Sequence, residues 1–395
     1  MSSSSPAQTD RIPLRIIARE WGRIGITGFG GPPAHIALLR KLCVEKYGWI
    51  DATEFEDGIA ATNLLPGPAS TQLAIFCAWR LRGRVGALVG GVCFILPGLV
   101  LIVLLSILFL EARPPTWVAG AAAGAGAAVP AIAVAAGAAL LPASWKRVGG
   151  HRPARIRWAL YLVLGVGAGA AIGAYLVIVL LALGVIEMAF QRDWRAHPPR
   201  GATSLLVPLL VPAAASVGGL LALAWVALKV GALSYGGGFV IIPLMQHDAV
   251  VSYHWMTNGQ FLNAVALGQV TPGPVVLTVA AVGYAAAGIG GALLATAIAF
   301  TPSFLFVLIG APHFDRLRAN RGIQAFLTGA GAAVVGGIIG SALPLGLALA
   351  QLWQLGILAG ALVWLFLFRR GVVSAIAIAA VIGVAFALLG APISR

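Results

Sequence analysis

The stretch Asn63-Leu64-Leu65-Pro66-Gly67-Pro68-Ala69-Ser70-Thr71-Gln72 decides the fold. It lies in a long apolar region, yet no continuous α-helix can pass through it, because Pro66 and Pro68 lack a backbone N–H and clash with the preceding turn. Gly67 between them permits backbone angles that other residues avoid. We therefore predict that one helix ends near Leu65 and that a new helix begins directly after the second proline.

A helix broken in this way has a chemical consequence inside a membrane. The first N–H groups of the new helix have no partner within that helix. Lipid cannot satisfy them, so such a break is stable only against protein or a polar cavity. The positive end of the helix dipole points into the same gap and favours an anion there.

The same device occurs a second time, in Gln269-Val270-Thr271-Pro272-Gly273-Pro274, at an offset of 206 residues. At that offset several further residues are identical, and they are Gly30 and Gly31 with Gly236 and Gly237, Tyr47 with Tyr253, Trp49 with Trp255, and Phe55 with Phe261. At an offset of 205, Gly83 pairs with Gly288 and Pro97 with Pro302. Paired aromatic residues and two Pro-Gly-Pro motifs indicate an internal duplication.

The composition places the chain in a membrane. Of its 395 residues, 60% are hydrophobic and only 10% are charged, whereas soluble domains carry about 25% charged residues. The net charge of +14 comes from Lys and Arg in short loops, as the positive-inside rule expects for an inner-membrane protein, and we predict no nucleic-acid partner. Cys43, Cys77 and Cys93 have no metal-ligand spacing, and we predict neither a metal nor a cofactor.

The chain divides into a disordered tail at 1–12, an N-terminal repeat at 13–200 and a C-terminal repeat at 201–395. We expect an interfacial helix at 13–23 and two re-entrant hairpins at 24–39 and 52–80; full crossing by broken helices is the alternative. Each arm of the second hairpin has about 11 residues and reaches ~16 Å, half of a ~30 Å hydrocarbon core.

The expected full spans are 85–110, 117–141, 158–190, 205–228, 291–311, 324–343, 346–367 and 372–390. Basic residues on both sides of 158–190 favour two crossings there.

The distribution of basic residues differs between the repeats. Arg80, Arg82 and Arg84 have no basic counterparts in 285–291, and basic loops reappear one span later, at Arg316, Arg318 and Arg321. Opposite charge bias is typical of inverted-topology repeats, which place a substrate at the repeat interface beside discontinuous helices. We therefore predict an all-α polytopic membrane protein with two homologous, inverted halves that contain broken or re-entrant helices.

These residues resemble the chromate ion transporter family in its long, two-domain form. The resemblance covers nearly the whole chain and rests on Gly28-Phe29-Gly30-Gly31-Pro32, Phe55-Glu56-Asp57-Gly58, Asn63–Pro68, Pro97-Gly98, Tyr235-Gly236-Gly237-Gly238 and Thr271-Pro272-Gly273-Pro274. It implies export of chromate from the cytoplasm and chromate resistance. Some relatives are tied to sulfate, which has the same shape and charge. Chromate follows from the resemblance, whereas composition and spacing indicate only duplicated broken helices in a membrane.

The predicted substrate site lies at the breaks, because a dianion that leaves water needs hydrogen-bond donors. Its residues are Asn63, Pro66, Gly67, Pro68, Ser70, Thr71, Gln72, Gly30, Gly31, Gly236, Gly237, Gln269, Thr271, Pro272, Gly273 and Pro274. We assign more of the contact to the first copy, since the second has Val275, Val276 and Leu277 where the first has polar residues. Three alternatives stay open. The breaks are packing kinks, the glycine runs are tight helix crossings, or the carboxamides of residues 63 and 269 only cap the helices at the breaks.

Other ionisable residues are ambiguous. Glu54, Glu56 and Asp57 are either solvated residues at a cytoplasmic mouth or a proton-coupling group. Lys229 is a lone cation near a predicted break, which either pairs with substrate or extends to the headgroups. His35, His247, His254 and His313 show no metal-ligand spacing and are interpreted as ordinary loop or interface residues.

The sequence therefore predicts a secondary transporter, since it contains no nucleotide-binding motif, with alternating access by one half rocking against the other. No nucleophile–base pair lies at the breaks, so we predict no enzymatic activity. Transport of sulfate or another oxyanion and an anion channel are the alternative functions. The coupling ion, the direction of flux and a possible homodimer are not determined by the sequence.

Overall fold

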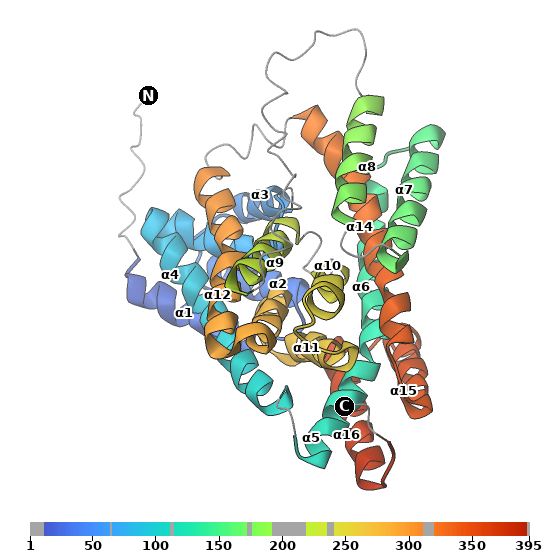
Figure 1. Cartoon of the computed structure of the whole chain (residues 1–395). Helices are drawn as coiled ribbons and strands as arrows, with labels where there is room; N and C mark the ends of the chain where they lie inside the picture. Colours follow the sequence, from blue (N-terminus) through green and yellow to red (C-terminus); the bar gives the residue numbers. More distant parts are fainter. Residues whose placement is uncertain are drawn as a thin grey trace, which may run out of the picture.

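The computed structural model describes residues 12–63, 65–110, 114–171, 176–191, 219–234, 241–310 and 320–392. Every regular element in these ranges is helical, which confirms the all-α class (Figure 1). Four helical stretches are long and apolar enough to cross a membrane, and they are Ala69–Phe109, Thr116–Lys146, Val275–Gly310 and Arg321–Leu347. The chain is thus an integral membrane protein.

The first half contains eight α-helices and one π-helix within the described residues. They are α1 (Leu14–Thr27), α2 (Pro32–Arg40), the π-helix η1 (Lys41–Lys46), α3 (Ala52–Thr62), α4 (Ala69–Phe109), α5 (Thr116–Ala127), α6 (Val129–Lys146), α7 (Arg152–Ala171) and α8 (Leu176–Gln191).

The second half repeats this order. Its described elements are α9 (Leu220–Leu233), α10 (Ile241–Gln246), the π-helix η5 (His247–Ser252), α11 (Asn258–Val270), the 3₁₀ turn η6 (Val275–Leu277), α12 (Thr278–Gly310), α14 (Arg321–Leu347), α15 (Leu352–Leu362) with the π-helix η8 (Val363–Leu367), and α16 (Val372–Leu388).

Backbone geometry confirms the duplication at the breaks and at the bends that follow. Gly67 and Gly273, at the centre of the two Pro-Gly-Pro motifs, have φ angles of 120° and 102°. The long helices α4 and α12 then both bend at a glycine, Gly83 with φ 59° and Gly288 with φ 62°. Only glycine adopts these angles without strain, so the two copies need glycine at the same places for the same reason.

Aromatic pairs also repeat between the halves. Tyr47 stacks on Trp49 with ring centroids 4.2 Å apart, and Tyr253 stacks on Trp255 at 4.8 Å. Each pair directly follows a π-helix, η1 in the first half and η5 in the second. The duplication therefore extends from sequence letters to side-chain packing.

The breaks expected within 24–39 and 52–80 are both present. Helix α1 ends at Thr27 and α2 begins at Pro32, while α3 ends at Thr62 and α4 begins at Ala69. With 11 residues, α3 reaches only ~16 Å, about half of the hydrocarbon core. The half-length first arm predicted for the second hairpin is therefore confirmed, whereas α4 continues through a bend at Gly83 to Phe109.

Several predicted spans have the expected position. Beyond their glycine bends, α4 and α12 match the predicted spans 85–110 and 291–311 to the last described residue, and α14 and α16 match 324–343 and 372–390 within a few residues. The stretch 158–190 forms two helices, α7 and α8, as the flanking charges favoured. The beginning of the predicted span 205–228 lies outside the described residues, and α9 continues past its predicted end.

The predicted span 117–141 lies within the membrane-length helical stretch Thr116–Lys146, in which α5 passes into α6 through a kink at Ala128. Pro130 in the first turn of α6 has no N–H to continue the bonding of α5. Two other boundaries were wrong for local reasons. The span predicted to start at 346 starts at Leu352, where the Gln354 side chain accepts a hydrogen bond from the Gln351 N–H. The helix predicted at 13–23 continues to Thr27 before the glycine-rich break.

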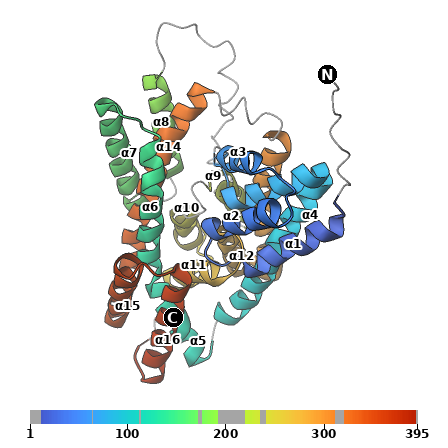
Figure 2. The same ribbon diagram turned by 180° about the vertical axis from the view of Figure 1, so that it is seen from behind.

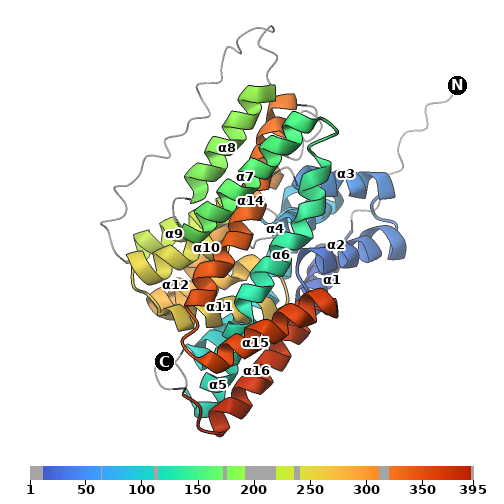
Figure 3. The ribbon, with the colours of Figure 1, turned by 90° about the vertical axis from the view of Figure 1, so that its right-hand side faces the viewer.

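The two halves interlock rather than lie side by side. Helix α14 of the second half packs along α7 and α8 of the first, and α5 of the first half packs along α16 of the second (Figure 3). Glycines permit the close approach: a Cβ atom at Gly169 would overlap the carbonyl oxygen of Gly337, and one at Gly124 would overlap that of Ala379. Small residues at helix crossings are the usual means of packing in lipid.

The helices consequently form two groups that each draw on both halves. We call α1–α4 with α9–α12 the broken-helix body, and α5–α8 with α14–α16 the bundle. Figures 1 and 2 show the bundle as an elongated set of helices along one side of the broken-helix body. Within the body, α1 packs on α4, α9 packs on α12, and α4 packs on α12.

The inverted topology leads to a labelling prediction. Arg84→Cys and Ile289→Cys, each exposed just past an equivalent bend, are expected to react with a membrane-impermeant maleimide from opposite faces of the membrane. These positions are preferable to the preceding glycines, whose positive φ a cysteine would strain. The background would lack Cys43, Cys77 and Cys93. Labelling of both sites from one face would contradict the inverted arrangement.

Candidate functional site

The two Pro-Gly-Pro breaks each lie against a break or kink of the other half. The Gly273 N–H donates to the Gly28 carbonyl at 3.1 Å, which ties the second break to the end of α1. A Cβ atom at Gly67 would lie 3.2 Å from Ser303 Oγ, and one at Gly98 would overlap the Pro272 carbonyl oxygen. Gly98 and Ser303 each follow a helix-interior proline. The breaks are thus brought together by contacts that cross between the halves.

At the first break, α4 begins with unpaired amides. The N–H groups of Thr71 and Gln72 donate to the Pro68 carbonyl at 2.9 and 3.0 Å. No side chain caps this helix end, and within the described part of the chain the N–H groups of Ala69 and Ser70 have no acceptor. Two backbone donors at the positive end of a helix dipole therefore remain for a ligand or water.

Buried side-chain atoms without a partner gather at the breaks. In the described ranges these atoms are Thr71 Oγ1, Gln72 Oε1, Gln269 Nε2, Ser234 Oγ and Ser303 Oγ. Thr71, Gln72 and Gln269 belong to the two Pro-Gly-Pro motif regions, Ser303 lies beside Gly67, and Ser234 directly follows α9. A buried polar group left unpaired costs about 1–3 kcal/mol, so a cluster of them is expected only where a ligand or water completes the bonding.

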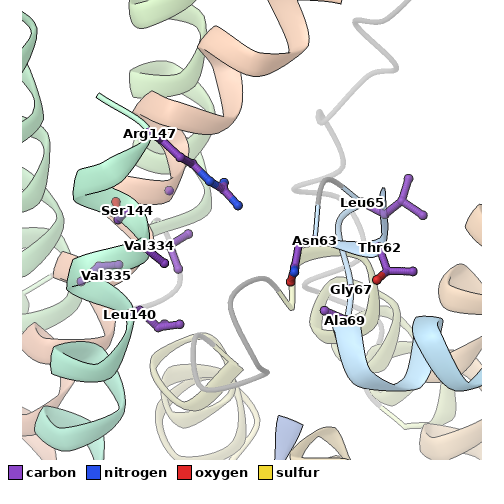
Figure 4. Close-up of a pocket in the computed structure, with 12 residues that line it drawn as sticks. Thr62, Asn63, Leu65, Gly67, Ala69, Leu140, Ser144, Arg147, Val334 and Val335 are labelled. Atoms are coloured by element: carbon purple, nitrogen blue, oxygen red, sulfur yellow. The ribbon is translucent and has the colours of Figure 1, made fainter. Parts of the chain in front are cut away.

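A cavity of about 140 Å³ opens at the first break. Asn63, Gly67 and Ala69 line one side of it, and α6 contributes Ser144 and Arg147 on the other (Figure 4). In Figure 4 the side chain of Arg147 extends from the end of α6 into the space that faces the break. A guanidinium therefore stands opposite the positive end of α4, an arrangement that attracts anions.

The Gln72 side chain holds the shape of the first break. Its Nε2 donates to the Pro66 carbonyl at 2.7 Å, and a Cβ atom at Gly67 would overlap that nitrogen. This bond leaves the amide oxygen as the unpaired atom. Gln72 thus acts on the backbone of the break, whereas Thr71 keeps its hydroxyl without a partner.

The Asn63 side chain makes no hydrogen bond within the described residues, and it points into the cavity in Figure 4. It follows α3, where its backbone N–H donates to the Ile59 carbonyl. Because the carboxamide caps nothing, this geometry favours the ligand-contact interpretation over the capping one.

At the second break the threonine hydroxyls have partners. The hydroxyl of Thr271 donates to the Leu267 carbonyl at 2.7 Å, and that of Thr278 donates to the Val275 carbonyl at 2.8 Å. Both hydroxyls are therefore used within their own helices. Gln269 is the residue of this break whose side chain has a donor without a partner.

The predicted glycine sites are only partly described. Gly30 and Gly31 have φ angles of 99° and 74°, and a Cβ atom at Gly31 would lie 3.8 Å from the Val275 side chain, so this turn faces the second break. Gly236 and Gly237 lie outside the described residues.

The acidic residues near the start of α3 are ion-paired. Glu54 pairs with Arg80 and Glu56 with Arg40. Both carboxylates are partly exposed, and Asp57 is exposed on the same helix. These pairs suit a charged, solvated mouth.

Sequence reasoning misjudged three residues. Arg147 is one of the basic residues that precede 158–190, and it also lines the cavity at the first break. Lys229 is not a lone cation, because it pairs with Asp248 of η5. His35 is not an ordinary loop residue: it is fully buried on α2 and bridges the Gly28 carbonyl and the Ser70 hydroxyl. The contacts of Lys229 with Asp248 and of His35 with Ser70 join residues 19 and 35 positions apart, and no local pattern marks them.

Comparison with known proteins identifies the relatives of this chain. The family model described as chromate transporter matches residues 16–188 and 221–384. A chromate transport protein of Cupriavidus metallidurans is 34% identical over 336 residues, which cover 84% of this chain and 82% of the relative. One of Pseudomonas aeruginosa is 32% identical over 356 residues, with 85% and 82% covered. No solved structure matches the chain.

Proposed function

The chain belongs to the chromate transporter family, and we propose that it is a secondary transporter that carries chromate out of the cytoplasm through the gap between the two breaks. In this proposal the first break binds the oxyanion, and α6 with Ser144 and Arg147 forms the opposite wall of the cavity. Because one chain supplies both breaks, the proposed site needs no second copy.

The observation that carries the proposal is the set of unpaired donors at the breaks. A tetrahedral dianion that leaves water must regain its hydrogen bonds. The amides of Ala69 and Ser70, the hydroxyls of Thr71 and Ser303 and the amide nitrogen of Gln269 are donors without acceptors in the described part of the chain. They supply this bonding without a formal charge, so a dianion can leave again as well as bind.

The cavity at the first break supports entry from the cytoplasm. Arg147 lines it and belongs to a basic loop with Lys146, Arg152 and Arg155. Basic loops lie on the cytoplasmic side of membrane proteins. Entry on that side, drawn by Arg147 and the helix dipole, suits export.

The interlocked packing suggests which parts move. Because α14 packs on α7 and α8, and α5 packs on α16, neither half of the sequence can rotate as a unit without separating helices that pack through glycine. We therefore replace rocking of the halves with movement of the broken-helix body against the bundle. The cavity at the first break lies between these two groups.

The inequality of the copies gives a prediction about affinity. Ser70→Ala combined with Thr71→Ala is expected to raise the KM for chromate by about tenfold or more, since hydrogen bonds to charged groups contribute about 1.5–3 kcal/mol. Thr278→Ala is the matched control, because its hydroxyl already bonds to Val275. Chromate flux in vesicles measures both. Equal effects would refute the assignment of the oxyanion to the first copy.

Sulfate is the second candidate cargo, and a specific observation favours it. The unpaired groups are hydroxyls and amides, which recognise the shape and charge of a tetrahedral dianion rather than its central atom. The test is flux of radiolabelled chromate and sulfate in reconstituted vesicles with an imposed pH gradient. Saturable flux that the gradient alters supports a carrier. Ohmic single-channel current, or no chromate flux under any gradient, would contradict the proposal.

A further inference from the structure

His35 is a buried titratable group that the proposed transport path does not yet use. Its side chain is on α2, with none of its surface exposed to solvent. Nε2 lies 2.8 Å from the Gly28 carbonyl oxygen, and Nδ1 lies 3.2 Å from Ser70 Oγ. The ring also meets Phe94 edge-on at 5.1 Å. His35 thus connects the break after α1 to the first turn of α4.

The hydrogen-bond chemistry fixes the tautomer. A carbonyl oxygen can only accept, so Nε2 must carry a proton toward Gly28. In the neutral ring Nδ1 is then an acceptor, and the Ser70 hydroxyl donates its single proton to it. While His35 is neutral, the Ser70 hydroxyl therefore has no hydrogen to offer an anion and presents only lone pairs, which repel one.

Protonation reverses this bond. In the imidazolium both ring nitrogens donate, so Nδ1–H donates to Ser70 Oγ and the hydroxyl hydrogen is released for another acceptor. We propose that His35 and Ser70 link the uptake of one proton to the binding of one tetrahedral dianion at the first break. This inference rests on the proposed function, and it names the coupling ion that the sequence left open.

The surroundings of His35 make the two events depend on each other. The ionisable residues on α2 and on the elements packed against it are Arg15, Arg19, Glu20 and Arg23 on α1, Arg40 on α2, Lys41, Cys43, Glu45 and Lys46 on η1, and Cys77, Arg80, Arg82, Arg84 and Cys93 on α4. None of them forms a hydrogen bond or an ion pair with His35 in the described structure. A buried imidazolium therefore lacks a counter-charge until the dianion arrives, and the dianion lacks the Ser70 donor until the proton arrives.

The linkage is confined to one repeat. At the offset of 206 the counterparts of His35 and Ser70 are Ile241 and Val276, neither of which can carry or relay a proton. One proton is therefore taken up for each dianion bound, and the proton and the dianion together carry a net charge of −1. By reciprocity the dianion strengthens proton binding by the same factor as the proton strengthens dianion binding.

The test is the pH dependence of chromate binding to the full-length protein from about pH 7 to about pH 9, where His35 without ligand is neutral. In the wild type the apparent Kd is expected to rise about tenfold per pH unit, because each binding event takes up one proton. His35→Gln should bind weakly and without this slope, since a carboxamide donates to Gly28 and accepts from Ser70 at every pH.

The controls separate the linkage from the site itself. His247→Gln removes a half-buried histidine that also meets a serine, Ser252, at 3.1 Å, and it should keep the wild-type slope. If His35→Gln does not fold, Ser70→Ala gives a second test, because it keeps the ring and removes the hydroxyl, and it should also flatten the slope. An unchanged slope in His35→Gln or Ser70→Ala would overturn the linkage alone. Absence of chromate binding in the wild type at every pH would instead overturn the proposed function.

Discussion

Replacing Pro66-Gly67-Pro68 with three alanines is expected to abolish chromate transport while the protein remains in the membrane at its normal level. Alanine has the highest helix propensity, so α3 and α4 would tend to join through the break. The N–H groups of Ala69 and Ser70 would then bond within the helix and be lost to the anion. Loss of two bonds to a charged group, each about 1.5–3 kcal/mol, predicts a fall in flux of at least about 100-fold.

The measurement is chromate flux in vesicles, normalised to the amount of protein in the membrane. Pro142→Ala is the matched control, because Pro142 lies inside α6 and is exposed, and it should transport normally. A second pair of variants tests the central glycine alone. Gly67→Ala should impair transport. Gly149→Ala is its control and should transport normally, because Gly149 also has a positive φ, 73°, but has open space around it. Normal flux in the triple variant would remove the break from the mechanism.

Arg147→Gln is expected to raise the KM for chromate by about 10- to 100-fold, since a charge-assisted hydrogen bond contributes about 1.5–3 kcal/mol. The wild-type KM should also rise with salt concentration, because ions screen the attraction between the guanidinium and the anion. That salt dependence should shrink in the variant. Initial rates over a range of chromate and salt concentrations measure both effects.

Arg152→Gln is the control for this prediction. Arg152 is exposed in the same basic loop but is not among the residues that line the cavity at the first break. It should leave the KM within about twofold of the wild type, because exposed surface charges act weakly through water. An equal loss in both variants would mean that the charge of the loop as a whole attracts the anion, without a specific place for Arg147.

The features that the sequence predicted well depend on local backbone chemistry. Proline and glycine restrict or free their own backbone, so Pro66-Gly67-Pro68 predicts its break regardless of what surrounds it. The repeat was visible because large residues such as Trp49 and Trp255 keep one spacing. The difference in sequence between the copies, Ser70 and Thr71 against Val276 and Leu277, is read directly from the same alignment.

The features that the sequence did not predict depend on tertiary contacts. His35 and Ser70 are 35 positions apart and meet because α2 folds back onto the start of α4. Arg147 faces Asn63 only because α6 passes beside the first break. The interlocked halves rest on glycine faces of α7 and α14, and in a chain with 51 glycines no single glycine indicates its partner.

The central claim is that backbone amides at the start of α4 hold the oxyanion. Chromium scatters X-rays anomalously, so crystals of the protein grown with chromate would locate the anion directly. The account predicts an anomalous peak within hydrogen-bond distance of the Ala69 and Ser70 amides, on the side of the break that faces Arg147. A chromate bound elsewhere, with these amides directed at protein or lipid, would contradict it.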